Sequence, residues 1–100
     1  MLTIEKEYLS QLKEIVITLL KDEDVKIVLF GSRARGDNHR FSDVDIGIIP
    51  LGKLRAERIT LLKEKVEDLN VPYKVEIVNL LEVSESFRTE ALKDAVVWKG

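Results

Sequence analysis

The sequence predicts a single α/β domain in which helices cover a small mixed β-sheet. Its 100 residues are enough for about one domain, so residues 1–100 are taken as one unit. Apolar residues make up 45% of the chain, with only five Gly and two Pro, as in a packed globular protein. These apolar residues follow helical and strand periods in turn, in the order helix, strand, strand, helix, strand, helix.

The first half of the chain is predicted to form a helix, a strand, a polar turn and a second strand. Residues 3–22 carry apolar side chains at three- and four-residue steps, and the acidic run 22–24 ends this amphipathic helix. Residues 25–30 are apolar and largely β-branched, which indicates a buried strand ending at Gly31. The Gly- and Arg-rich residues 31–40 suit a turn, a short helical piece and a loop. Residues 44–49 form the second strand, which Pro50 stops.

The second half adds a helix, a strand and a shorter helix. Residues 54–69 have a helical apolar stripe, which the sequence Asn-Val-Pro at 70–72 breaks. Residues 73–78 are predicted to be the third strand, and residues 84–94 a helix with Ser84 as its N-cap. Residues 95–98 suit either a final strand or a packed tail.

Composition excludes several classes of function. The chain has no Cys, which removes disulfide scaffolds, Cys-ligated zinc and thiol catalysis. Its 16 Lys and Arg against 18 Asp and Glu give a net charge of −2, so neither nucleic acid nor an anionic membrane is expected as a partner. The first residues do not resemble a secretory signal, and no apolar run approaches the roughly 20 residues of a membrane span. We therefore expect a cytoplasmic protein.

Two carboxylates at the start of the second strand are the first candidate site residues. Asp43 and Asp45 are two positions apart, so in a strand they project from the same face, while Val44 and Ile46 point into the core. Adjacent carboxylates repel each other unless a cation lies between them. Hard oxygen ligands are those that Mg²⁺ prefers, and Mg²⁺ usually brings a substrate phosphate with it.

The turn after the first strand is predicted to hold that phosphate. Gly31 permits close approach of the backbone to a ligand, and successive N–H groups in such a turn, or at the start of a helix, bind anions. The Ser32 hydroxyl can donate to a phosphate oxygen. Arg33 and Arg35 add two guanidinium groups, which bind phosphate oxygens in two-pronged fashion, although surface ion pairing is the simpler alternative for both.

A third carboxylate is available on the third strand. Val75 and Ile77 face one side of that strand and Glu76 faces the other. If the third strand lies beside the second, Glu76 can join the two aspartates in a two-metal site or accept a hydroxyl proton. The simpler alternatives are that Glu76 is an ordinary solvent-facing residue and that Lys74 forms a cross-strand ion pair.

The pattern Gly31-Ser32, ten intervening residues, Asp43-x-Asp45 and a later lone acid resembles the nucleotidyltransferase fold of the DNA polymerase beta superfamily. The short chain is most similar to the minimal nucleotidyltransferases (MNT), the antitoxins of HEPT/MNT toxin–antitoxin pairs. The resemblance covers residues 25–78 well, and it matches Gly31 and Ser32 to the phosphate-holding pair and Asp43 and Asp45 to the metal-binding pair. Glu76 matches the third acid, where the family more often has Asp.

The resemblance implies a function and a partner. It implies transfer of AMP from ATP, with two Mg²⁺ ions, to a hydroxyl group, expected to be that of a Tyr on a HEPT-type toxin. The alternative is a catalytically weak or inactive nucleotide-binding antitoxin that neutralises its partner by contact, because Glu76 departs from the family pattern. About fifty residues build the predicted site and leave little surface to hold an acceptor, so we expect the chain to work in a hetero-oligomer or homodimer.

Overall fold

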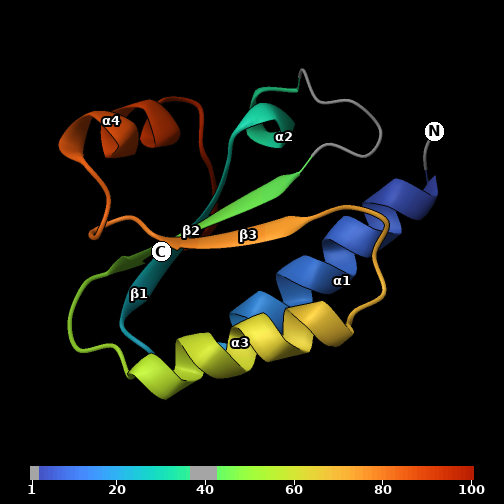
Figure 1. Ribbon diagram of the computed structural model, residues 1–100, viewed down its shortest axis with the longest axis horizontal. Helices are drawn as coiled ribbons and strands as arrows, with labels where there is room; N and C mark the ends of the chain where they lie inside the picture. The colour runs from blue at the N-terminus through green and yellow to red at the C-terminus, as the bar shows by residue number, and fades with distance from the viewer. Residues whose placement is uncertain (1–2, 37–42) are drawn as a thin grey trace.

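The computed structural model describes residues 3–36 and 43–100 and confirms the predicted order of elements (Figure 1). The helices and strands alternate along the chain as α1 (Thr3–Leu19), β1 (Val25–Phe30), α2 (Ser32–Arg35), β2 (Val44–Pro50), α3 (Ala56–Asp68), β3 (Val75–Asn79), α4 (Glu85–Lys93) and β4 (Val96–Lys99). The last segment is therefore a strand rather than a packed tail. No helix within these described ranges combines the length and apolar character needed to cross a membrane.

The four strands form one mixed sheet in the order β3-β2-β1-β4. β1 pairs antiparallel with both β2 and β4, whereas β2 and β3 run parallel. Parallel neighbours need a crossover connection, and α3 supplies it. In Figure 1, α1 and α3 lie together on one side of the sheet, and α2 and α4 lie on the other. The mixed sheet with helices is the predicted fold class.

The core follows from the two-residue period of the strands. Alternate strand residues, among them Ile27 and Ile46, are fully buried against Leu12 of α1 and Leu62 of α3. The intervening residues of β1 face the other side of the sheet, where Val28, Phe30 and Leu80 form a smaller buried cluster with Ala91 of α4 beside it. The strand periodicity therefore divides the sheet into a face covered by α1 and α3 and a face that α4 covers in part.

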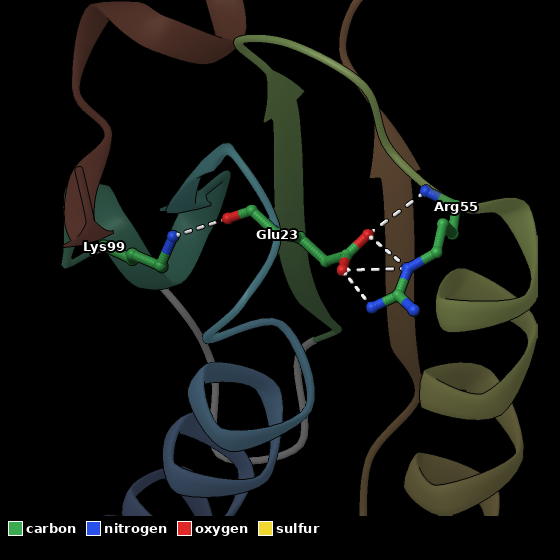
Figure 2. Close-up of polar contacts among 3 residues, drawn as sticks. All are labelled: Glu23, Arg55 and Lys99. Atoms are coloured by element: carbon green, nitrogen blue, oxygen red, sulfur yellow. Dashed lines mark hydrogen bonds and ion pairs between the residues drawn. The ribbon is translucent and has the colours of Figure 1, made fainter.

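A buried acidic residue that the sequence did not reveal, Glu23, joins three parts of the chain through its carboxylate and its backbone oxygen (Figure 2). Glu23 lies in the acidic run after α1, yet it is only 6% exposed, and its carboxylate accepts hydrogen bonds from the backbone N, Nε and Nη2 of Arg55 at 3.1, 3.2 and 2.6 Å. The Arg55 hydrogen bonds hold the pKa of Glu23 below its ordinary value, and the same carboxylate raises the pKa of Arg55. Lys99 Nζ donates to the backbone oxygens of Glu23 and Val25 at 2.9 and 3.2 Å, which ties the end of β4 to the same turn.

This contact also explains a boundary that the sequence misplaced. The predicted helix over 54–69 begins only at Ala56, because Arg55 is extended (φ −79°, ψ 124°) and directs its N–H to Glu23. The third strand likewise begins at Val75 instead of residue 73. Tyr73 is 8% exposed and packs its ring at 6.5 Å, edge to face, against Tyr8 of α1 before the strand starts. Tertiary contacts decide both boundaries.

Candidate functional site

The parallel pairing of β2 and β3 brings two of the predicted acids together. Asp45 of β2 is the direct partner of Glu76 of β3, so both side chains project from the same face of the sheet. Phe30 of β1 is the partner of Asp45 on its other side. The carboxylates therefore lie on the face opposite α1 and α3. The sequence analysis required β3 to lie beside β2 for Glu76 to join the aspartates, and the structure has this arrangement.

Asp45 is the most perturbed carboxyl of this group. Its burial raises its pKa above the ordinary value, and the negative charges of Asp43 and Glu76 raise it further, while Arg35 acts in the opposite direction. Asp43 lies directly before β2 and is exposed. Three acids that repel one another in this way favour a proton or a cation among them. Carboxylate oxygens are also the donors that Mg²⁺ prefers, so Asp43, Asp45 and Glu76 could hold a divalent cation.

Gly31 brings the turn after β1 into contact with Asp45. Its backbone angles, φ 80° and ψ −159°, belong to a region that essentially only glycine occupies. A Cβ atom built on Gly31 would overlap Oδ2 of Asp45. Only a residue without a side chain therefore permits this approach of the turn to the carboxylate. Ser32 follows at once as the first residue of α2, which places its half-buried side chain at the predicted phosphate turn.

The two arginines of this turn have different surroundings. Arg35 is close enough to Asp45 for its charge to lower the pKa of that carboxyl. The guanidinium of Arg33 instead lies 4.5 Å from the centre of the Tyr73 ring, in a cation–π contact. Tyr73 was missed by sequence reasoning, because an aromatic residue before a strand gives no sign of a partner 40 positions earlier in the chain. Phosphate binding by Arg33 and Arg35 stays a prediction.

Glu76 has a second partner besides the aspartates. Its Oε1 lies 2.9 Å from Nζ of Lys74, and this contact raises the pKa of Lys74. The expected cross-strand ion pair of Lys74 is therefore wrong: its partner is two residues further along the same segment, on the same side of the chain. Within residues 3–36 and 43–100, no three acidic or histidine side chains converge as a ready metal site. His39 lies outside the described residues.

Comparison with known proteins identifies the family. A family model described as Polymerase beta, Nucleotidyltransferase matches residues 7–99. The chain belongs to the polymerase beta nucleotidyltransferase family. This nucleotidyltransferase is 35% identical over 99 residues to the "Probable protein adenylyltransferase MntA" of Haemophilus influenzae, a match that covers 96% of this chain and 82% of the relative.

Solved structures share the fold of this nucleotidyltransferase. A crystal structure of a toxin–antitoxin with AMP-PNP contains a chain that matches with a TM-score of 0.67 and 26% identity, over 88% of this chain and 73% of that one. The structure of a tri-AMPylated Shewanella oneidensis HEPN toxin in complex with an MNT antitoxin contains a chain of similar fold. That match has a TM-score of 0.62 and 21% identity over 91% of this chain and 71% of that one.

Proposed function

We propose that this nucleotidyltransferase transfers AMP from ATP to a tyrosine hydroxyl of a HEPT-type toxin and thereby acts as its antitoxin. The pairing of Asp45 with Glu76 beside the Gly31 turn is the observation that carries the proposal, because it brings carboxylates that can bind a cation next to a turn suited to phosphate. The family of the chain and the adenylyltransferase name of its Haemophilus influenzae relative support the reaction. The toxin–antitoxin structure with AMP-PNP supports both the nucleotide and the kind of partner.

The acids of the site fit a divalent cation. Asp43, Asp45 and Glu76 offer oxygen donors only, and the pKa of Asp45 is raised by burial and by the other two charges, so positive charge at this place relieves repulsion. We propose that these three residues hold two Mg²⁺ ions. Bound Mg²⁺ would supply positive charge for the phosphate oxygens and make the acceptor hydroxyl easier to deprotonate. Glu76 would have to leave its contact with Lys74 to take part.

The turn between β1 and α2 is proposed to hold the triphosphate. The Gly31 backbone approaches Asp45 closely, and Ser32 presents its hydroxyl at the next position. The charge of Arg35 lowers the pKa of Asp45, and we propose that the same charge attracts phosphate held at these acids. Arg33 adds a second positive charge at the side of this turn that faces Tyr73.

The proposed reaction is a single displacement at the α-phosphorus of ATP. The acceptor oxygen forms a bond to the α-phosphorus, and the bond from that phosphorus to the oxygen bridging to the β-phosphate breaks. Pyrophosphate leaves, AMP remains on the acceptor, and a carboxylate of the acid group accepts the hydroxyl proton. The chain is proposed to do this in the cytoplasm, in complex with the toxin.

Transfer of label from ATP tests the proposal. The protein is incubated with α-³²P-ATP, Mg²⁺ and a HEPT-type toxin encoded beside it, and we expect labelled toxin. Asp43→Asn should abolish the label, whereas Asp68→Asn, which removes an exposed charge at the end of α3, should not. Absence of transfer by the wild-type protein, or equal transfer by Asp43→Asn, contradicts the proposal.

The binding-only alternative gives a different result in the same system. If the protein neutralises its toxin by contact, the double variant Asp43→Asn/Asp45→Asn will protect cells from the toxin as well as the wild type does. The ion pair between Lys74 and Glu76 is the observation that favours this alternative, since it engages the third acid. Loss of protection in the double variant, with the toxin complex still formed, supports the transferase.

A further inference from the structure

The outer edge of β3 presents backbone groups that the sheet does not use. β3 is the terminal strand in the order β3-β2-β1-β4. The N–H of Val44 donates to the oxygen of Lys74 at 2.8 Å, and the N–H of Leu80 donates to the oxygen of Ile48 at 2.9 Å. In a parallel ladder, alternate residues turn both backbone groups to the neighbouring strand. The even-numbered residues of β3 therefore direct their backbone groups to β2, and Val75 and Ile77 direct their N–H and C=O groups outward. The oxygen of Asn79, at the end of the strand, accepts a hydrogen bond from the N–H of Glu82 at 3.0 Å.

This edge is regular, whereas the opposite edge of the sheet is not. β3 keeps an unbroken register with β2 over five successive residue pairs. β4 has only four residues, and its register with β1 shifts between Ile27 and Val28. Short strands and register shifts are means by which proteins keep a sheet edge from pairing with another chain. Of the two edges, β3 is the one that can accept a further strand.

Two hollows lie along the β3 edge, and the smaller of them reaches the candidate site. One of about 780 Å³ is lined by residues that include Ile59 and Lys63 of α3 with Ile77 and Asn79 of β3. The other, of about 220 Å³, is lined by Lys63, Val66 and Ile77 and also by Glu76, one of the proposed metal ligands. Lys63 and Ile77 line both, so the two hollows are neighbours between α3 and the strand edge, and together they are called the groove.

We propose that an extended segment of the acceptor protein binds in this groove as an added strand next to β3 and places its hydroxyl residue beside Glu76. The inference rests on the proposed function and adds to it how the acceptor docks. An extended chain is the occupant that matches the outward N–H and C=O groups of Val75 and Ile77, which have the spacing of a strand edge. The reaction requires the acceptor hydroxyl to reach the acids, and this groove ends on one of them.

Side chains alternate between the two faces of a strand, and this alternation determines which residues of the acceptor contact which face of the sheet. A residue paired with Glu76 points its side chain to the acid-bearing face of the sheet, and its two neighbours point to the opposite face. On that face the groove is lined by the apolar side chains of Val66 and Ile77 together with the charged Lys63 and Glu67 of α3. We expect the acceptor to carry apolar residues, which can pack on Val66 and Ile77, immediately before and after the modified hydroxyl residue.

Amide hydrogen exchange in the full chain, followed by NMR, tests the docking site. The probe is a nine-residue peptide with a central Tyr flanked by a Val on each side, and the comparison peptide has Lys in both flanking positions. With the first peptide, exchange of the Val75 and Ile77 amides should slow, while the amide of Val97 in β4 stays unchanged. Protection elsewhere, or equal effects of both peptides, overturns the inference. Protection without peptide that increases with protein concentration also overturns it, since a second copy then occupies the edge.

A pair of α3 variants tests the same groove by kinetics. Lys63→Trp fills the groove, and Glu64→Trp adds the same bulk at the next exposed position, which lines neither hollow. Lys63→Trp should raise the KM for the acceptor at least about fivefold, equivalent to roughly 1 kcal/mol of lost binding, and leave the KM for ATP unchanged. If both variants still transfer AMP and have equal KM values for the acceptor, the docking site is overturned and the proposed function is not affected. Absence of any transfer contradicts the proposed function instead, and the exchange experiment still decides the docking site.

Discussion

Replacing Gly31 by Ala should reduce stability and activity through two separable effects. The first is backbone strain: at φ 80° and ψ −159° an alanine costs about 1–3 kcal/mol. For a domain of this size, 2 kcal/mol corresponds to a fall in Tm of about 8–16 °C. The second effect is steric, because the new Cβ would overlap Oδ2 of Asp45 and displace that carboxylate from its place beside Glu76. Mg²⁺-dependent transfer should therefore be lost even where the variant is folded.

Gly36→Ala is the matched control for this substitution. Gly36 also has a positive φ, 84°, but among the described residues a Cβ built on it meets nothing within 4 Å. Its replacement should cost about 1–2 kcal/mol of strain and leave transfer unchanged. A double variant, Gly31→Ala/Asp45→Ala, separates the two effects, because removing the Asp45 carboxylate removes the overlap and leaves only the strain.

The Tm values of these variants and their transfer of label from ATP to the toxin test the prediction. We expect the cost of Gly31→Ala to be smaller in the Asp45→Ala background by about 0.5–3 kcal/mol, the usual coupling of residues in contact. If Gly31→Ala lowers Tm no more than Gly36→Ala and retains wild-type transfer, the close approach of the turn to Asp45 has no role in the site.

Three further predictions concern single side chains. Burial and like charges raise the pKa of Asp45 in the folded protein. Ionised Asp45 therefore lowers the free energy of unfolding at pH values above its folded pKa, and it has no such effect below its unfolded pKa of about 3.9. Without Mg²⁺, Asp45→Asn should then have the higher Tm at pH 7, with a gain that disappears towards pH 3; a gain independent of pH would contradict this. Tyr73→Leu should raise the KM for ATP, whereas Tyr73→Phe, which keeps the ring under Arg33, should not; equal KM values would exclude a role for the stacking. Glu23 has a lowered pKa through its hydrogen bonds to Arg55, so its stabilising effect is present above the unfolded pKa and is lost as pH falls through the folded one. Glu23→Gln should therefore lower Tm at pH 7 and converge with the wild type in acid, which melting curves at several pH values would show.

The sequence predicted the elements and the faces of the strands because both depend on local periods. Asp45 was assigned to the face opposite Ile46 by strand alternation alone, and the burial of Ile46 against α1 and α3 agrees with that assignment. Glu76 was likewise assigned to the face opposite Ile77. Each of these inferences needs only neighbours within a few residues.

Contacts between distant residues were beyond local patterns. Glu23 was predicted only as part of a polar helix stop, but its partner Arg55 is 32 positions away and buries it. Tyr73 was predicted to begin a strand, but its ring packs instead against Tyr8 and under Arg33. Neither residue differs in type or spacing from an ordinary surface acid or a strand aromatic, so no sequence signal distinguished them.

The sequence by itself determined the content of the candidate site: a glycine turn after a buried strand, two acids two residues apart, and a third acid on the same face of a later strand. Only the tertiary structure decided that Asp45 and Glu76 are direct partners, that Gly31 touches Asp45, and that Arg33 and Arg35 have different surroundings. Residue type and period set which way a side chain points within its own element. Which elements become neighbours, and in what register, depends on the packing of the whole sheet against its helices.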